Sequence, residues 1–511
     1  MLLAVIDWEY DWSAGMTKTV DEHSAQSSRD GSSHEERNLR PLVVDIDGTL
    51  VRSDFLYECL LQCVKHKPWT ILALIFWVLR GKAYLKARLY EYGGEYVSAD
   101  FLPYRPEVLS FIEQATQAGR PVILASGSDA RFVENVAKHL ELKGQHFGSS
   151  GGVNLTSSRK ADRLVRALPD GFDYIGNSSA DIAVWKAAGV RYGAGVSGGL
   201  ERRVISKGMT LERLTPPEKM LKPMIKSLRL HQWAKNLLIF TIFAITYPAY
   251  GLGPLLETGV GFVLLGMVAS GTYVINDLLD IEADRRHTTK RDRALASGQL
   301  AVPLALALAL GLIAIAHVAA YFIAPLFCLV IAGYCALTLS YSFILKRFAI
   351  VDVFCLASLF SLRVIAGGAI IAVAPSPWLL SFMFFFFLSL ALAKRVVELN
   401  RKRDTVPPAQ WGETLAGRGY SVNDRDFVIS GGLATAALSL NVFFIYSLLS
   451  NLTLFSSPWL AMLAGVVLAF WLLRMWYLAV RGDMHDDPIY FAVKDWLSVV
   501  LGAILLMLVI V

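Results

Sequence analysis

The chain has 511 residues, of which 54% are hydrophobic, and a mean hydropathy of +0.46. Soluble proteins of this length rarely have so apolar a composition, so the numbers exclude a purely soluble protein and indicate membrane-spanning segments. The net charge of +6 fits basic loops beside a membrane. It is no evidence of nucleic-acid binding.

Residues 1–40 are a polar, low-complexity leader with SAQSSRDGSSHEER at its centre. This composition predicts disorder. The leader has no apolar stretch after a basic start, so we expect no secretory signal, and Met16 is an alternative start.

Residues 41–215 have the pattern of a soluble α/β domain. Apolar runs of strand length end in polar residues, and helical stretches lie between them. This order predicts a doubly wound parallel sheet whose polar residues lie at the carboxyl ends of the strands. Those residues are Asp45 and Asp47 (PLVVDIDGTL), Ser126 (PVILASGS), and Asn177 and Asp181 (FDYIGNSSAD).

These segments, with Lys160 between the last two, resemble in order the motifs of the haloacid-dehalogenase superfamily. The resemblance implies phosphatase chemistry and Mg²⁺, which offsets the repulsion between a carboxylate nucleophile and a phosphate. Asn177 departs from the family pattern, which has an acid there. The alternative is a phosphate-binding regulatory module. The implied roles are Asp45 as nucleophile, Asp47 as general acid–base, Ser126 and Lys160 as phosphate ligands, and Asp45, Asn177 and Asp181 as metal ligands.

Residues 54–103 fall where this superfamily inserts a cap. They include PWTILALIFWVLRGKAYLKARLY, which is more apolar than an ordinary solvated surface. Two interpretations stay open, a helical cap with its own small core and a surface that docks against the membrane or the membrane domain.

After a linker at 216–230, residues 225–511 are mostly apolar stretches of membrane-spanning length. The connections after the second, fourth, sixth and eighth stretches are basic, and those after the odd-numbered stretches carry no charge. Basic loops face the cytoplasm, so we expect an inner-membrane protein whose α/β domain and active site are cytoplasmic. The nine predicted spans are 230–250, 256–279, 301–323, 325–345, 350–373, 377–398, 428–450, 457–479 and 491–511.

The second predicted span ends in NDLLDIEAD at residues 276–284. Its three aspartates are spaced three and four apart, so a helix would carry them on one face. Carboxylates at membrane depth are costly unless they line a wet cavity or hold a cation, which predicts Mg²⁺ and a bound diphosphate. The cations that follow directly suit an anionic substrate. The acidic residues are Asp277, Asp280 and Asp284, beside Asn276, and the cations are Arg285, Lys290 and Arg293.

The NDxxDxxxD motif and the nine expected spans resemble the UbiA superfamily of intramembrane prenyltransferases, over about residues 225–511. Most members carry a second acidic motif after the sixth span. Here LALAKRVVELNRKRD places Lys394, Arg395 and Glu398 there instead. One acidic and one basic pole suit a ligand with two separate anionic groups, such as phosphoribosyl pyrophosphate, better than a prenyl diphosphate.

Five further segments resemble one branch of that superfamily, the decaprenyl-phosphate phosphoribosyltransferases. They are LRLHQWAKN (228–236), YSFILKRFAIVD (341–352), LRVIAGGA (362–369), AKRVVEL (393–399) and DDPIYFAVKD (486–495). The resemblance implies that the acidic cluster with Asn276 binds Mg²⁺ and pyrophosphate, and that the cations after it hold the diphosphate or the lipid phosphate. Candidates for the ribose phosphate or the acceptor phosphate are Tyr341, Lys346, Lys394 and Arg395. Asp352 and Arg363 are either an intramembrane ion pair or site residues.

The expected reaction is therefore Mg²⁺-dependent transfer of phosphoribosyl from phosphoribosyl pyrophosphate to a polyprenyl phosphate, followed by removal of the 5′-phosphate by the fused phosphatase domain. The alternative is transfer of a polyprenyl group from its diphosphate to an aromatic acceptor such as 4-hydroxybenzoate. A transporter or lipid-binding scaffold is the third possibility. The confinement of the charged clusters to one side of the membrane speaks against transport, which needs access from both.

Overall fold

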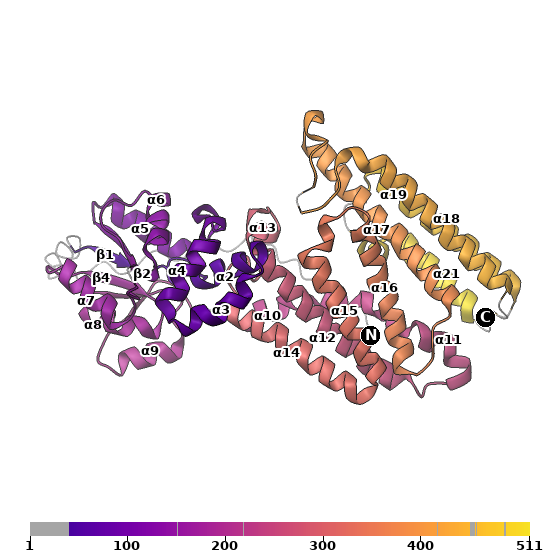
Figure 1. The fold of residues 1–511 in the computed structure, drawn as a ribbon, viewed down its shortest axis with the longest axis horizontal. Helices are drawn as coiled ribbons and strands as arrows, with labels where there is room; N and C mark the ends of the chain where they lie inside the picture. Colours follow the sequence, from indigo (N-terminus) through magenta and orange to yellow (C-terminus); the bar gives the residue numbers. More distant parts are fainter. Residues whose placement is uncertain are drawn as a thin grey trace, which may run out of the picture.

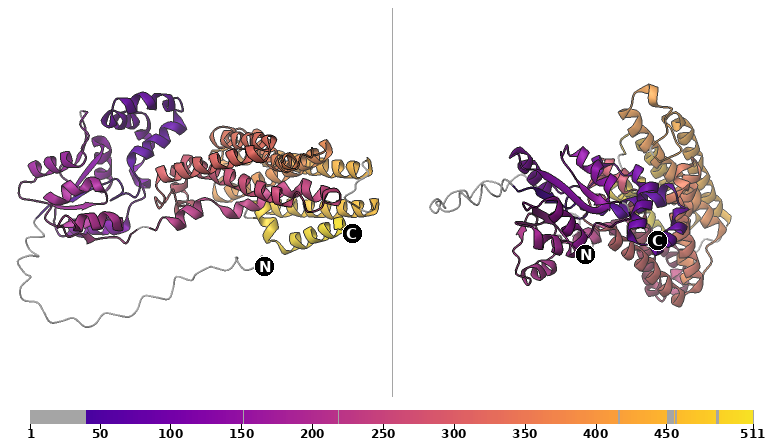
Figure 2. Two further views of the ribbon diagram at one scale, coloured as in Figure 1. Left: turned by 90° about the horizontal axis from the view of Figure 1, so that it is seen from below. Right: turned by 60° about the vertical axis from the view of Figure 1, so that its left-hand side comes forward.

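The computed structural model describes residues 40–510 apart from residues 151, 218, 416, 450–454, 456, 485 and 486. The expected disordered leader and the alternative start at Met16 lie outside the described residues. The described chain forms two bodies placed end to end, an α/β domain and a bundle of long helices (Figure 1). The left view of Figure 2 shows the same arrangement from below.

A six-stranded sheet forms the centre of the α/β domain, in the order β3-β2-β1-β4-β5-β6, and neighbouring strands are parallel. Successive side chains of a strand point to opposite faces, so Leu42 and Val44 enter one core cluster and Val43 enters the other. The strands are β1 (Leu42–Val44), β2 (Val122–Asp129), β3 (Phe147–Ser149), β4 (Asp173–Gly176), β5 (Arg191–Gly193) and β6 (Glu212–Arg213).

Helices cover both faces of this sheet. Apolar residues of α5 and α6 share the core with Leu42 and Val44, and those of α7, α8 and α9 share the core with Val43. The predicted parallel α/β domain is confirmed. The helices are α5 (Pro106–Gln117), α6 (Ala130–His139), α7 (Ser158–Ala167), α8 (Ile182–Ala187) and α9 (Gly198–Ile205).

The segment predicted as a cap folds into three helices. They are α2 (Phe55–His66), α3 (Thr70–Leu79) and α4 (Lys82–Gly93). Helices α2 and α4 pack on the core of the α/β domain. Helix α3 instead exposes Leu72, Phe76 and Leu79, to 74%, 69% and 79%. The segment thus combines a packed helical cap with one exposed apolar face.

Seven described helices are long and apolar enough to cross a membrane, so the chain is an integral membrane protein. Several begin with proline, which lacks the N–H that the first turn leaves unpaired. The seven are α12 (Leu255–Leu279), α14 (Val302–Ile323), α15 (Pro325–Phe343), α16 (Val351–Ile370), α17 (Pro377–Thr405), α18 (Arg425–Leu449) and α19 (Pro458–Arg481).

The prediction of nine spans is not confirmed, because neither the first nor the last predicted span forms one continuous helix. The first falls on a 3₁₀ helix, η4 (Leu230–Phe240), followed by α11 (Thr241–Tyr250). Helix η4 lies against α16 so closely that a Cβ at Gly367 would come within 1.9 Å of the Ile239 carbonyl oxygen. Polar residues of η4 also line a cavity described below, so this segment packs inside the bundle.

The last predicted span is a pair of helices, α20 (Pro488–Lys494) and α21 (Trp496–Ile510), bent by 84°. If the pair is one span, the described residues contain eight candidates. The break falls at Asp495, whose carboxylate accepts hydrogen bonds from Arg474 and from the backbone N–H of Ser498. That carboxylate caps the new helix, so α21 starts in a different direction.

Candidate functional site

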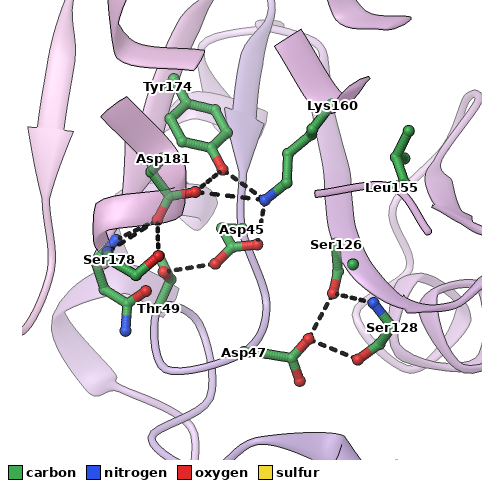
Figure 3. Close-up of polar contacts among 12 residues, drawn as sticks. Asp45, Asp47, Thr49, Ser126, Ser128, Leu155, Lys160, Tyr174, Ser178 and Asp181 are labelled. Carbon is green, nitrogen blue, oxygen red and sulfur yellow. Dashed lines mark hydrogen bonds and ion pairs between the residues drawn. The ribbon is translucent and has the colours of Figure 1, made fainter. Parts of the chain in front are cut away.

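The first candidate site lies at the carboxyl end of β1, where Asp45 meets side chains from three other segments (Figure 3). Lys160 Nζ, from α7, donates to Asp45 Oδ1 at 2.8 Å and to the Tyr174 hydroxyl at 2.9 Å, and lies 3.4 Å from Asp181 Oδ1. Asp45, Lys160 and Asp181 are 5%, 4% and 1% exposed. One buried ammonium group therefore lies between two buried carboxylates, as the parallel sheet predicts for strand ends that share an edge.

The two carboxylates differ in how they titrate. Burial raises the pKa of Asp45 to about 7, and the charge of Lys160 limits the rise. Burial also acts on Asp181, but Lys160 and hydrogen bonds from Tyr174 and the backbone N–H of Ser178 hold its pKa below the usual value. Asp181 is thus the more acidic of the two carboxyl groups, and a cation bound beside Asp45 would lower the pKa of Asp45.

Asp47 is fixed by a separate set of donors. Its Oδ2 accepts from the hydroxyls of Ser126 and Ser128, both at 2.6 Å, and its Oδ1 accepts from the backbone N–H of Phe55 at 2.9 Å. Ser126, predicted as a phosphate ligand, thus contacts Asp47 in this structure. Ser128 was not predicted, although it lies in the same strand-end motif.

Asn177 lines the same cavity as Asp45 and Asp181. It packs so closely over Gly48 that a Cβ there would lie 2.1 Å from Asn177 Nδ2, and Gly48 has a φ of +74°, which glycine adopts readily. Asp45, Asn177 and Asp181 can each offer a side-chain oxygen as a metal ligand, and an all-oxygen ligand set fits Mg²⁺. Together with Lys160 they form a polar pocket suited to a phosphoryl group.

The second candidate site is a cavity of about 630 Å³ inside the helical bundle. Cations outnumber carboxylates among its described lining residues, so it carries a net positive charge. The cations are Arg229, Lys235, Lys290, Arg293, Lys346, Arg363, Lys394 and Arg418, and the acids are Asp280, Asp284, Glu398 and Asp487.

The acidic cluster lies at one side of this cavity, but its helix is interrupted. Helix α12 ends at Leu279, and α13 (Ile281–Arg286) begins after Asp280. The expectation of one continuous helix face therefore holds only in part. Asn276, Asp280 and Asp284 line the cavity, whereas Asp277 lies behind them, 5% exposed.

Each carboxylate of the cluster has a cation beside it. Arg293 reaches both Asp277, at 3.2 Å, and Asp284, at 2.6 Å. Arg229 also pairs with Asp277, at 2.5 Å, and Lys346 pairs with Asp280 at 3.0 Å. These partners neutralise buried charge that would otherwise be costly.

Within the part of the chain that the structure describes, no three His, Cys, Asp or Glu side chains gather as a ready-made metal cluster. Mg²⁺, however, is commonly held by one or two carboxylates together with substrate phosphates. The oxygen donors of Asn276, Asp280 and Asp284 face one cavity and fit that mode of binding.

The predicted basic pole is divided between the cavity and the protein interior. Lys394 lines the cavity and pairs with Asp487 at 2.8 Å. Arg395 is fully buried, pairs with Asp352 at 2.7 Å and also contacts Glu398. Arg395 therefore holds α17 against α16 and does not line the cavity.

The proposed ion pair between Asp352 and Arg363 is wrong. Asp352 accepts hydrogen bonds from Arg395 and Tyr420. Arg363 lines the cavity and donates to Tyr334 at 2.9 Å. Arg363 therefore stays a candidate site residue, the other alternative that the sequence left open, whereas Asp352 does not line the cavity.

Of the remaining predicted residues, some line the cavity and one does not. Tyr341 and Lys290 line the cavity. Arg285 does not: its guanidinium makes a two-fold contact with Glu58 of the cap, at 2.7 and 3.1 Å. Four charged cavity residues were not predicted, although three of them lie in motifs that carried the resemblance. They are Arg229 and Lys235 in LRLHQWAKN, Asp487 in DDPIYFAVKD, and Arg418, which lies in no motif.

Comparison with known proteins identifies a family for each of the two domains. The model of the UbiA prenyltransferase family matches residues 237–499, and that of haloacid dehalogenase-like hydrolases matches residues 42–186. The chain therefore belongs to the UbiA prenyltransferase family and carries an N-terminal haloacid dehalogenase-like domain.

Among curated proteins, the uncharacterized protein y4nM of Sinorhizobium fredii is 38% identical over 470 residues, covering 91% of this chain and 89% of that protein. The nodulation protein NoeC of Azorhizobium caulinodans is 34% identical over 281 residues, covering 53% of this chain and 87% of NoeC. The decaprenyl-phosphate phosphoribosyltransferase of Mycolicibacterium smegmatis is 38% identical over 193 residues, but covers 36% of this chain and 59% of that enzyme.

Among solved structures, a UbiA homolog from Archaeoglobus fulgidus bound to GPP and Mg²⁺ matches with a TM-score of 0.43 and 17% identity. The match covers 57% of this chain and all of that one.

Proposed function

We propose that the membrane domain transfers a phosphoribosyl group from phosphoribosyl pyrophosphate to a polyprenyl phosphate, and that the N-terminal domain hydrolyses a phosphomonoester of the product. The observation that carries this proposal is the positive cavity of the bundle, with Asp280 and Asp284 at one side and Lys394 and Arg363 among its cations. A ligand with a diphosphate and a separate phosphate matches both sides.

The transfer step is a displacement at C1 of the ribose. A phosphate oxygen of the lipid acceptor forms the new bond to C1, the bond from C1 to the diphosphate oxygen breaks, and pyrophosphate leaves with that electron pair. The acceptor is already anionic, so no strong general base is needed. Mg²⁺, held by Asn276, Asp280 and Asp284, would offset the charge of the leaving group, and Arg293 and Lys346 lie next to these carboxylates.

In the hydrolytic step a carboxylate oxygen of Asp45 forms a bond to phosphorus while the bond from phosphorus to the ester oxygen breaks, and water then hydrolyses the aspartyl phosphate to release inorganic phosphate. Lys160 lies against Asp45 and neutralises charge that builds up at the carboxylate and the phosphoryl oxygens. Asp47, oriented by two serine hydroxyls, gives a proton to the leaving alkoxide and takes one from the attacking water. Mg²⁺ would be held by Asp45, Asn177 and Asp181.

The partial similarity to decaprenyl-phosphate phosphoribosyltransferases supports the phosphoribosyl donor. The alternative, polyprenyl transfer to an aromatic acceptor, rests on the family as a whole. The two are separated by giving the purified chain labelled phosphoribosyl pyrophosphate with polyprenyl phosphate, and in parallel a prenyl diphosphate with 4-hydroxybenzoate. We expect a labelled lipid from the first pair. A prenylated phenol from the second pair, with no labelled lipid from the first, would overturn the proposal.

A further inference from the structure

The hydrolase site is enclosed partly by the membrane domain. A cavity of about 400 Å³ lies over Asp45. One part of its lining is polar and comes from the α/β domain, with Asp45, Lys160, Lys86 and Arg52. The other part is apolar and comes from the membrane domain, namely Ile281, Leu295, Leu300, Ala301, Val302 and Pro303.

The two domains are in direct contact around this cavity. Arg285 follows the acidic cluster of the transferase, and its guanidinium binds Glu58 of cap helix α2 while its Nε donates to the Ala296 carbonyl at 2.9 Å. The side chains of Arg285 and Glu58 are 6% and 2% exposed. A buried ion pair therefore ties the cap to the loop that forms the apolar wall.

Close packing at the loop supports the same conclusion. A Cβ on Gly298 would lie 2.7 Å from Cβ of Arg52, so the loop backbone touches the α/β domain. Tyr57 and Leu61 of α2 pack against the apolar cluster of the membrane domain. The wall is thus a fixed part of the cavity.

Two polar residues, Arg52 and Ser53, line the cavity between its polar and apolar parts. Arg52 Nε and Ser53 Oγ are buried without a hydrogen-bond partner among the described residues, and both residues line the cavity. Arg52 and Ser53 thus add a cation and a hydroxyl-bearing residue to the polar side of the cavity, next to the phosphate position at Asp45.

The apolar wall leads into a helix of membrane-spanning length. Val302 and Pro303 form the first turn of α14, and Leu304 and Leu306 continue it with 40% and 41% of their surface exposed. A hydrocarbon chain can lie along this exposed apolar face while the phosphate reaches Asp45.

We propose that this cavity binds a phosphomonoester joined to a membrane lipid, with the phosphate at Asp45, the polar connecting group near Arg52 and Ser53, and the lipid against the start of α14. The inference rests on the proposed hydrolase function, whose substrate is lipid-linked, and adds that the membrane domain forms the wall of the hydrolase cavity that binds the lipid. The membrane domain then determines what the hydrolase accepts.

The test compares dodecyl phosphate with ethyl phosphate, using the full chain in lipid nanodiscs with Mg²⁺. The two esters have the same primary alkoxide leaving group, so a difference in their kcat/KM values reports binding of the dodecyl group. We expect at least a tenfold preference for dodecyl phosphate. The variant Ala301→Trp narrows the apolar wall and should lower this preference at least tenfold.

The matched control is Ala409→Trp, because Ala409 is an exposed alanine of the short 3₁₀ helix η7 (Pro408–Gln410) and lines neither cavity. This variant should keep the preference within twofold. Gel filtration and thermal unfolding verify that both variants fold. Equal hydrolysis of the two esters by the unmodified chain, or an unchanged preference in Ala301→Trp, would overturn the inference and leave the hydrolase function standing. If the chain hydrolyses neither ester, the hydrolase function fails, and the inference fails with it.

Discussion

The two sites of this chain differ in their ratio of carboxylates to cations. At the end of β1, two buried carboxylates share one ammonium group, Lys160, and lie within 3.4 Å of it. In the membrane cavity, cations outnumber carboxylates, and residues of the acidic cluster pair with Arg293 and Lys346. The first arrangement suits a single phosphoryl group with one metal ion. The second suits a larger ligand with several negative charges.

The difference follows from how each fold positions side chains. A parallel sheet brings the ends of its strands to one edge, so residues as distant as Asp45 and Asp181 are adjacent once the topology is set. A helical bundle has no such edge. Its cavity collects polar residues from η4, α12, α15, α16 and α17, and the partner of each charge depends on how those helices pack.

The largest effect is expected for the nucleophile of the hydrolase site. Asp45→Asn should lower phosphate release from a phosphomonoester by about three orders of magnitude or more, because the amide cannot attack phosphorus. Phosphate release is measured with the purified chain, and transfer activity serves as the internal control. Asp162→Asn, at an exposed position of α7, is the matched variant and should keep full activity. Unchanged release in Asp45→Asn would exclude the covalent mechanism.

The next effect concerns the contact between the two regions. Arg285→Met leaves the carboxylate of Glu58 buried without its cation, which should destabilise the folded chain by about 3–5 kcal/mol. The double variant Glu58→Leu/Arg285→Met removes both charges and should recover most of that loss. Thermal unfolding in detergent ranks the stabilities of the unmodified chain, the single variant and the double variant. Equal destabilisation by the single and double variants would show that the ion pair is not what holds the domains together.

A smaller effect is expected in the membrane cavity. Lys346→Met and Lys394→Met each remove a charged hydrogen-bond donor, worth about 1.5–3 kcal/mol, so the KM for phosphoribosyl pyrophosphate should rise by about 10- to 150-fold. Lys207→Met, at an exposed position of the α/β domain, should leave KM unchanged. If Lys346→Met raised KM and Lys394→Met did not, the basic pole at Lys394 would bind no second anionic group, and a prenyl diphosphate would be favoured.

The smallest effect is expected for Ser128→Ala. The change removes one of two hydroxyl donors to Asp47, and a hydrogen bond of this kind contributes about 0.5–1.5 kcal/mol. Phosphate release should therefore fall about two- to tenfold, and Ser126→Ala should behave alike because its hydroxyl lies at the same distance from Asp47. Loss of all activity in one variant alone would mean that this hydroxyl contacts the substrate.

The sequence predicted the α/β domain well, and also that its polar residues lie close together, because the carboxyl ends of parallel strands lie at the same edge of the sheet. It predicted less of the membrane cavity. Arg395 follows Lys394 directly, yet successive residues of a helix face about 100° apart, and only Lys394 reaches the cavity. The pairing of Asp352 with Arg395, and of Arg285 with Glu58 across 227 residues, depends on packing that residue spacing does not encode. The break at η4 was missed for the same reason.

One measurement tests the central claim directly. The full chain in nanodiscs receives polyprenyl phosphate, Mg²⁺ and phosphoribosyl pyrophosphate labelled at its 5′-phosphate. The label should enter the lipid fraction first and then appear as inorganic phosphate, and in Asp45→Asn it should stay in the lipid. If no label enters the lipid while the same preparation, given a prenyl diphosphate, prenylates 4-hydroxybenzoate, the account of the transferase site is wrong.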